Sequence, residues 1–248
     1  RGLFVADLIT RFIIHVREYY RQDGEETGQV PSFVACLARL NALYGDIPAK
    51  EFGPTQLRAY RSTVIAEGLA RVTVNQHQWR IRRMFRWAVS HELLPPAVSQ
   101  ALDTVENLQA GRTTAAEGEP VPPAEIAAVE KSFPYLHRDP AVRAVFEAMV
   151  RVHHATGVRA GELCRMVPAD IDRSGAEWLF TPKKHKNRWR GKRRRIWIGP
   201  RGQAVLGPLL DAVKPNELVF GYPRTKGGLR KGITVGLYTL RIREACRL

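Results

Sequence analysis

The sequence HHATGVRAGEL, residues 153–163, is followed by ADID at residues 169–172 and carries the strongest signal in the chain. Gly157 predicts the end of one helix, because glycine readily adopts the left-handed conformation that follows many helices. A second helix is expected to begin near Arg159. Glu162, three residues later, lies on the same helical side, where it could orient a neighbouring basic group or interact with the helix dipole. The stretch therefore predicts an arginine and a carboxylate presented together between two helices.

Regular patterns extend outward from this stretch on both sides. Apolar residues at 142–153 trace one face of the first helix, and the second helix is expected to continue through Met166 and Val167 up to Pro168. Turn residues fill 169–175. Further elements are predicted as a short helix at 123–129, a β-hairpin of strands 177–181 and 194–199, and helices at 202–213 and from 233 onward.

A strongly basic loop joins the two predicted strands. Its sequence, PKKHKNRWRGKRRR at 182–195, lies in a region without an acidic residue between Glu177 and Asp211. Because such charges repel one another unless neutralised, a phosphate backbone is the expected occupant, and Trp189 could pack on a sugar or base. The alternatives are a solvated hairpin tip or a nuclear-localisation-like run. Predicted DNA-binding residues here are Lys183, Lys184, Arg188, Arg190 and Lys192.

The N-terminal half has helical periodicity throughout. Helices are predicted at 3–22, 31–43, 54–68 and 73–91. In the last of these, Arg80 and Arg83 lie off the apolar stripe, so this basic face is either solvated or laid on phosphates, and both arginines are candidate DNA-binding residues. Residues 107–123 lose the periodicity and predict a linker. The expected organisation is a helical domain at 1–106, a linker at 107–123 and a second domain at 124–248.

The overall composition favours a polyanionic partner. The 248 residues carry a formal net charge of +15, and 44% of them are hydrophobic, which is enough for two globular cores. Nucleic acid is the first candidate. An anionic membrane is disfavoured, because no apolar run approaches the length of a spanning helix. The three cysteines are far apart and suggest neither a zinc site nor a disulfide framework.

The stretch at 155–163 resembles the first catalytic box of tyrosine recombinases of the phage-integrase type, A-T-G-[LM]-R-x-x-E-L followed by D-I-D. The resemblance implies a mainly α fold with a small β-hairpin or sheet. An N-terminal helical, SAM-like core-binding domain would precede an α+β catalytic domain. It also implies that Arg159 forks onto the scissile phosphate, where a guanidinium holds two oxygens as charge develops. Glu162 would then be a supporting residue.

The resemblance continues through the predicted hairpin. The family carries there a lysine that protonates the 5′-oxygen leaving group, and the sequence His-Lys-Asn identifies Lys186 as its counterpart, with Lys192 as the main rival. The strand of the form R-x-[IV]-P-[IL] corresponds to the stretch ending in Ile-Gly-Pro at 198–200. Before the linker, Arg86-Trp87-Ala88-Val89 resembles the F-x-W-A segment of the core-binding domain.

One departure from the family pattern concerns its second box, H-x-x-R, and the nucleophilic tyrosine. By the family's order both follow Leu248, so the chain is expected to be truncated before them and inactive alone. Tyr222 and Tyr238 precede that point and are expected to be packing or surface residues.

The resemblance implies site-specific DNA breakage and rejoining through a 3′-phosphotyrosyl link, with duplex DNA as partner and a homotetramer on paired sites. It implies no metal, no cofactor, no small-molecule substrate and no membrane partner. A cytoplasmic, nucleoid-associated protein is expected. The alternatives are a non-catalytic duplex-DNA-binding protein on a recombinase scaffold and an RNA-binding domain that uses the same basic hairpin.

Overall fold

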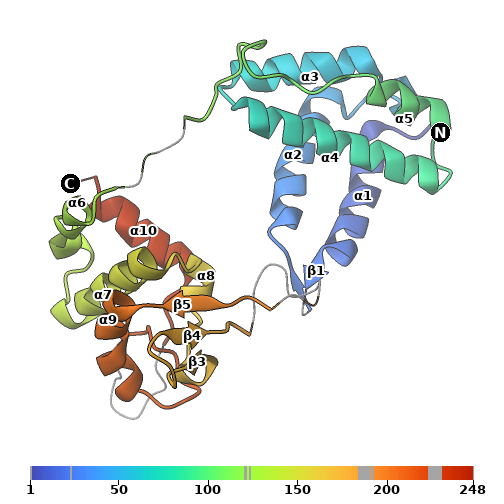
Figure 1. Cartoon of the computed structure of the whole chain (residues 1–248). Helices are drawn as coiled ribbons and strands as arrows, with labels where there is room; N and C mark the ends of the chain where they lie inside the picture. Colours follow the sequence, from blue (N-terminus) through green and yellow to red (C-terminus); the bar gives the residue numbers. More distant parts are fainter. Residues whose placement is uncertain are drawn as a thin grey trace. The chain divides into compact units, whose positions relative to one another are not determined.

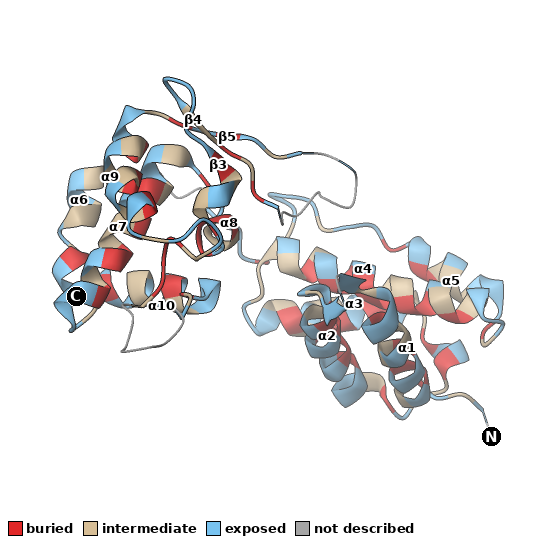
Figure 2. Cartoon of the chain, turned by 90° about the horizontal axis from the view of Figure 1, so that it is seen from below, coloured by how far each residue is buried: buried red, intermediate tan, exposed pale blue. Residues whose placement is uncertain are grey.

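The computed structural model describes residues 2–22, 24–119, 122, 124–183, 191, 193–222 and 231–247. The chain divides into two compact units, residues 1–121 and 122–248 (Figure 1). Each unit has a hydrophobic core of its own. The buried residues of each unit lie on the inner faces of its helices and strands (Figure 2).

The first unit is helical. Helices are α1 (Val5–Tyr19), α2 (Gln29–Tyr44), α3 (Pro54–Ala66), α4 (Arg71–Ser90) and α5 (Pro96–Asp103). The four helices predicted from periodicity are confirmed, and α5, which begins at a proline in its first turn, is additional. The strands β1 (Arg21–Gln22) and β2 (Glu25–Glu26) pair as a short antiparallel hairpin between α1 and α2, and a 3₁₀ turn, η1 (Ala49–Glu51), precedes α3.

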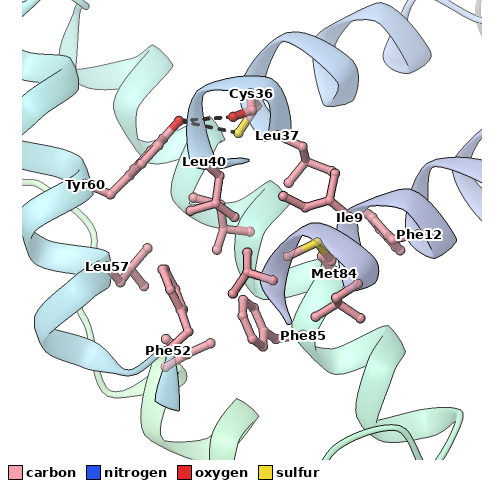
Figure 3. Close-up of a cluster of buried hydrophobic side chains, with 14 of the residues drawn as sticks. Ile9, Phe12, Cys36, Leu37, Leu40, Phe52, Leu57, Tyr60, Met84 and Phe85 are labelled. Atoms are coloured by element: carbon pink, nitrogen blue, oxygen red, sulfur yellow. Dashed lines mark hydrogen bonds between the residues drawn. The ribbon is translucent and has the colours of Figure 1, made fainter. Parts of the chain in front are cut away.

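The core of the first unit forms where α1 to α4 bring their apolar stripes together (Figure 3). Phe52 stacks on Phe85 with ring centroids 5.0 Å apart, and Phe12 meets Phe33 edge to face. Cys36 and Tyr60 are fully buried, and the Tyr60 hydroxyl donates to the carbonyl of Cys36 at 3.4 Å. Helix α4 contacts α1, α2, α3 and α5 and therefore lies at the centre of the unit.

The segment 107–117, predicted as part of a linker, lies on the first unit. Asn75 of α4 donates to the carbonyl of Leu108 at 3.0 Å and accepts from its amide at 2.8 Å. The amide of Arg71 donates to the carbonyl of Ala116 at 2.9 Å. The absence of apolar periodicity therefore marks irregular backbone here, and side-chain amides of α4 satisfy that backbone.

The second unit combines helices with a small sheet. Its helices are α6 (Ile126–Glu130), α7 (Pro140–Thr156), α8 (Ala160–Leu163), α9 (Pro200–Asp211) and α10 (Val235–Ala245), with 3₁₀ turns η2 (Phe133–Tyr135) and η3 (Pro168–Asp170). The strands β3 (Ile171–Asp172), β4 (Trp178–Phe180) and β5 (Ile196–Ile198) form an antiparallel sheet in the order β3-β4-β5. The predicted hairpin is confirmed as β4 and β5.

Two expectations for this unit need correction. Strand β3 occupies part of the segment predicted as turn residues, because Ile171 is buried and pairs with Phe180 of β4. The predicted helix from Arg159 to Val167 is much shorter, since α8 ends at Leu163. The Met166 carbonyl instead accepts a hydrogen bond from the Val219 amide at 2.9 Å, which ties this segment to a distant part of the unit. The predicted mainly α fold with a small sheet is confirmed.

Within the described ranges, the longest helices are too short or too polar to cross a lipid bilayer.

Candidate active site and nucleic-acid interface

Arg159 lies at the junction of α7 and α8. Helix α7 ends at Gly157, whose φ of 61° and ψ of 20° are left-handed and therefore suit a residue without a side chain. The chain then turns so that Val158 is buried and Arg159 becomes the N-cap residue of α8. The Arg159 side chain is 48% exposed. The local sequence thus places a guanidinium at the surface on a rigid junction.

Glu162 is almost completely buried beneath this arginine, with 2% of its side chain exposed. One carboxylate oxygen, Oε1, accepts from the Arg159 guanidinium at 3.2 Å. The other, Oε2, accepts from the Arg159 backbone amide at 3.1 Å. Both roles left open by the sequence therefore occur at once. The carboxylate caps the first turn of α8, and it also orients the basic side chain.

Arg194 is a third member of this cluster and was not singled out by the sequence. Its Nε donates to Glu162 Oε2 at 2.9 Å. Strand alternation explains its position, because Arg194 has the same parity as the buried Ile196 and Ile198 of β5. Its neighbours Arg193 and Arg195 have the opposite parity and are exposed. The sequence could have indicated this position, because strand alternation puts only the middle of the three consecutive arginines on the same face as the apolar residues.

The cluster of Arg159, Glu162 and Arg194 has a defined electrostatic character. Two guanidinium groups share one buried carboxylate, which leaves a net charge of +1. Both arginine side chains are partly exposed, and some of their N–H donors have no partner among the described residues. A guanidinium held in this way can offer a planar pair of donors to an oxyanion without first losing side-chain freedom. The geometry is therefore suited to an anionic, phosphate-like group.

A cavity of about 260 Å³ adjoins the cluster. Glu162 and the buried Asp170 both line it, together with Arg165 and Lys183. Lys183 forms an ion pair with Asp170 at 3.0 Å, although the lysine side chain itself is largely exposed. Lys183 was predicted to bind DNA, and the structure places it three residues beyond the end of β4, with a carboxylate partner.

The remaining predicted residues of the basic loop lie outside the described residues. They are Lys184, Lys186, Arg188, Arg190 and Lys192. Their proposed roles stay predictions. The ends of the loop are described, and they bring Lys183 and Arg194 to the two carboxylates Asp170 and Glu162.

In the first unit, the two candidate arginines of α4 differ. Arg80 is 8% exposed and its guanidinium lies 5.7 Å from the centroid of the Phe33 ring. The burial of Arg80 corrects the expectation that this residue belongs to an exposed basic face. Helix α2, which carries Phe33, covers that side of α4. Arg83 is half-buried among aromatic rings at the surface. Their binding to DNA stays a prediction.

The two C-terminal tyrosines lie in structural positions. Tyr238 of α10 is 1% exposed, and its hydroxyl shares a hydrogen bond with His153 Nδ1 at 3.0 Å. Burial raises the pKa of Tyr238 and lowers that of His153. Tyr222 is half-buried and packs against the core of the second unit. A buried hydroxyl with a raised pKa is poorly placed to attack a macromolecular substrate.

Comparison with known proteins identifies similar solved structures. The sequence matches no family model and no curated protein. A lambda integrase tetramer bound to a Holliday junction is 12% identical, with a TM-score of 0.69 over 99% of this chain and 66% of that chain. A lambda integrase (75–356) dimer bound to a COC′ core site is 15% identical, with a TM-score of 0.68 over 99% of this chain and 82% of that chain.

A transposon integrase has the same architecture. The Tn1549 integrase (residues 82–397) in complex with circular intermediate DNA is 15% identical, with a TM-score of 0.60 over 93% of this chain and 70% of that chain. This chain thus spans about two thirds of the length of the lambda integrase in the tetramer structure. The chain has the fold of these integrases.

Proposed function

We propose that this protein is a tyrosine-type site-specific DNA recombinase. The observation that carries the proposal is the cluster at the junction of α7 and α8. There the buried Glu162 holds the guanidinium of Arg159 at the surface, and Arg159 matches the first catalytic arginine of the family in the sequence motif. The integrase fold and the net charge of +15 support the same conclusion.

In the proposed reaction a tyrosine hydroxyl attacks the phosphorus of a phosphodiester. A 3′-phosphotyrosyl bond forms, the bond to the 5′-oxygen breaks, and that oxygen takes a proton from Lys186. Arg159 binds the non-bridging oxygens and stabilises the charge that develops on them. The tyrosine is proposed to lie outside the 248 residues, in accordance with the family's order. No resident metal is part of this scheme.

The proposed partner is duplex DNA, bound by the predicted core-binding unit and by the basic loop. A homotetramer on paired sites and a cytoplasmic, nucleoid-associated location belong to the same proposal. The integrases with this fold include complexes with DNA and a tetramer on a Holliday junction. Integration, excision and resolution are equally compatible with the cluster.

A second candidate function is a non-catalytic duplex-DNA-binding protein on the recombinase scaffold. The observation that favours it is the burial of Tyr238, whose hydroxyl is already bonded to His153. The buried Tyr238 hydroxyl is therefore not an accessible nucleophile. Both candidates predict binding of duplex DNA, and only the first predicts covalent chemistry.

The decisive experiment is covalent trapping on a nicked suicide substrate, resolved on denaturing gels. A form of the protein that includes the second box and its tyrosine should give an adduct, and the 248 residues alone should give none. Arg159→Ala and Arg159→Lys should both abolish the adduct while leaving binding largely intact, because lysine keeps the charge but loses the planar fork. Arg201→Ala, which removes one exposed arginine outside the basic loop, is the matched control and should cleave like the parent.

Three results would count against the proposal. Near-normal cleavage by Arg159→Lys would make Arg159 structural. An adduct mapped to Tyr222 or Tyr238 would show that the nucleophile has been misplaced. Duplex binding without an adduct in any form of the protein would favour the non-catalytic candidate.

The general acid is tested with a substrate whose bridging 5′-oxygen is replaced by sulfur, since this leaving group needs no proton. Lys186→Ala should slow cleavage of the normal substrate by about 10²–10⁴-fold and cleave the sulfur substrate almost as well as the parent. Lys192→Ala should mainly weaken binding. Rescue of Lys192→Ala by sulfur, with Lys186→Ala still impaired, would move the general acid to Lys192.

A further inference from the structure

The surface of the first unit carries an arginine enclosed by aromatic rings, where the end of α1 meets α4. The guanidinium carbon of Arg83 lies 5.2 Å from the ring centroid of Tyr19, 5.5 Å from that of Tyr20 and 5.5 Å from that of Trp79. Tyr19 is 60% exposed and Trp79 is 44% exposed. We call these four residues the Arg83 patch.

Two other arginines of α4 have partners on α5. Arg86 forms a two-pronged ion pair with Asp103 of α5, with Nη2 at 2.8 Å and Nε at 3.2 Å from the carboxylate oxygens. Arg82 donates from Nε to the carbonyl of Leu102 at 3.0 Å and lies 3.9 Å from the same Asp103. The charge on this side of α4 is thus partly neutralised by α5.

Arg83 differs from its neighbours because it has no hydrogen-bond acceptor and no carboxylate within the described part of the chain. Arg80, one turn earlier, is buried beside Phe33 and exposes little of its guanidinium. Among the arginines of α4, Arg83 therefore combines an accessible guanidinium with unused donors. The rings restrict its side chain, so little conformational entropy is lost when an acceptor binds.

The chemistry of the patch fits a nucleic-acid strand. An arginine with free N–H donors binds a phosphate oxygen, and exposed aromatic faces pack on the adjoining sugar or base. An apolar protein partner is a poorer match, because it would leave the Arg83 donors buried without acceptors. A carboxylate-bearing protein would satisfy the cation but would leave the exposed faces of Trp79 and Tyr19 without a specific partner.

We propose that the Arg83 patch is the contact of α4 with duplex DNA, in which Arg83 binds a backbone phosphate and Trp79 packs on the neighbouring sugar. The inference rests on the proposed DNA-binding function and narrows it. In this inference Arg83 alone, among the arginines of α4, contacts the DNA backbone. Arg82 and Arg86 hold α4 to α5.

The test is the affinity of the 248-residue chain for a labelled duplex, measured by fluorescence anisotropy across a series of KCl concentrations. Arg83→Ala should weaken binding about tenfold at low salt and reduce the slope of log affinity against log salt by about 0.9, the value for one phosphate contact. Arg86→Ala is the matched control. It removes the same charge from the same helix, yet the slope should stay at the parent value, because Asp103 already occupies that arginine.

The aromatic part of the patch predicts a different signature. Trp79→Ala should weaken binding about tenfold without changing the salt slope, since packing on a sugar or base releases no counterion. Trp79→Phe should recover most of the loss. Arg83→Lys should restore most of the slope. Thermal melts of each variant should match the parent, which separates loss of contact from loss of fold.

The outcomes distinguish this inference from the proposed function. A parent chain that does not bind duplex DNA overturns both. A parent that binds, with Arg83→Ala no weaker than Arg86→Ala, overturns the Arg83 patch alone. A loss by Trp79→Ala that is confined to single-stranded DNA or RNA overturns the duplex contact and assigns the patch to unpaired strands.

Discussion

At the scale of single residues, the buried His77 makes the stability of the first unit depend on pH. His77 lies on α4, is 6% exposed and shares a hydrogen bond with the Tyr60 hydroxyl at 2.9 Å. Burial and the nearby positive charges of Arg80 and Arg39, offset in part by Glu67, lower its pKa from 6.5 to about 4. The neutral imidazole is therefore the form that the fold accommodates.

Because the folded pKa lies below the unfolded one, the unfolded chain binds more protons between pH 6.5 and 4, and stability rises with pH across this window. The contribution is fully present above pH 6.5 and is lost as the pH falls to about 4. A shift of this size corresponds to about 3 kcal/mol at about 1.4 kcal/mol per pK unit. We expect urea denaturation at pH 7, 5.5 and 4 to show this loss. The His77→Gln variant keeps a neutral hydrogen-bonding side chain, so between pH 7 and 4 its free energy of unfolding should fall by about 3 kcal/mol less than that of the parent. Parallel curves of stability against pH for the two proteins would refute the assignment.

The Arg159 cluster also belongs to the residue scale, and it shows what a short motif can predict. The spacing of Arg159 and Glu162 follows from one helical turn, so their pairing was accessible from the sequence. Arg194 comes from 32 positions further along, and its contact with Glu162 depends on the register of β5 against the α7–α8 junction. No local pattern specifies that register alone.

At the scale of elements, the end of α7 determines where Arg159 lies. The N-cap Asp139 accepts hydrogen bonds from the amides of Ala141 and Val142, and Pro140 suits the first turn. At the other end Gly157 reverses the chain into α8. The helix thus has defined start and stop signals, and its stop positions the candidate catalytic arginine.

We expect Gly157→Ala to destabilise the second unit by about 1–2 kcal/mol, because an L-residue pays that cost at left-handed φ. A Cβ at this position would meet no atom within 4 Å, so the loss would come from the backbone alone. Gly157→Asn should be milder. Gly236→Ala in α10, where a Cβ is also unobstructed, should instead stabilise by up to about 1 kcal/mol. Urea denaturation checks all three, and equal effects of the two alanine substitutions would contradict the argument.

At the scale of the whole molecule, the chain has two cores and a high positive charge. The segment 107–117 contributes to the first unit through Asn75 and Arg71 of α4, and Ala115 within it is buried. A boundary drawn at residue 106, where periodicity ends, would remove these contacts. A segment without apolar periodicity, such as 107–117, can therefore still be part of a folded unit.

We expect a fragment of residues 2–119 to be more stable than one of residues 2–106 by about 1–3 kcal/mol, since the longer fragment keeps the hydrogen bonds of Asn75 with Leu108 and of Gln78 with Asn107. Thermal melts followed by circular dichroism measure the difference. Asn75→Ala in the longer fragment should remove part of it. Identical melting temperatures of the two fragments would show that the segment 107–117 contacts α4 without stabilising the unit.

The net charge of +15 predicts strongly salt-dependent binding of duplex DNA. Each phosphate contact contributes about −0.9 to the slope of log affinity against log salt, so six contacts would lower the affinity about 10³-fold between 50 and 200 mM salt. Titrations at several KCl concentrations measure the slope. Salt-independent affinity, or no binding at low salt, would refute the electrostatic argument.

The sequence by itself determined the properties that depend on neighbouring residues. The helices α1 to α4, the β4–β5 hairpin and the pairing of Arg159 with Glu162 follow from periodicities and spacings within a few turns. The tertiary structure alone decided which of several similar residues face a partner. Arg80 is buried, Arg86 is paired with Asp103, and Arg83 has no carboxylate partner among the described residues, although the sequence does not distinguish the three positions on α4. The physical reason is that burial and charge neutralisation come from α1, α2 and α5, whose contacts with α4 join residues far apart in the chain.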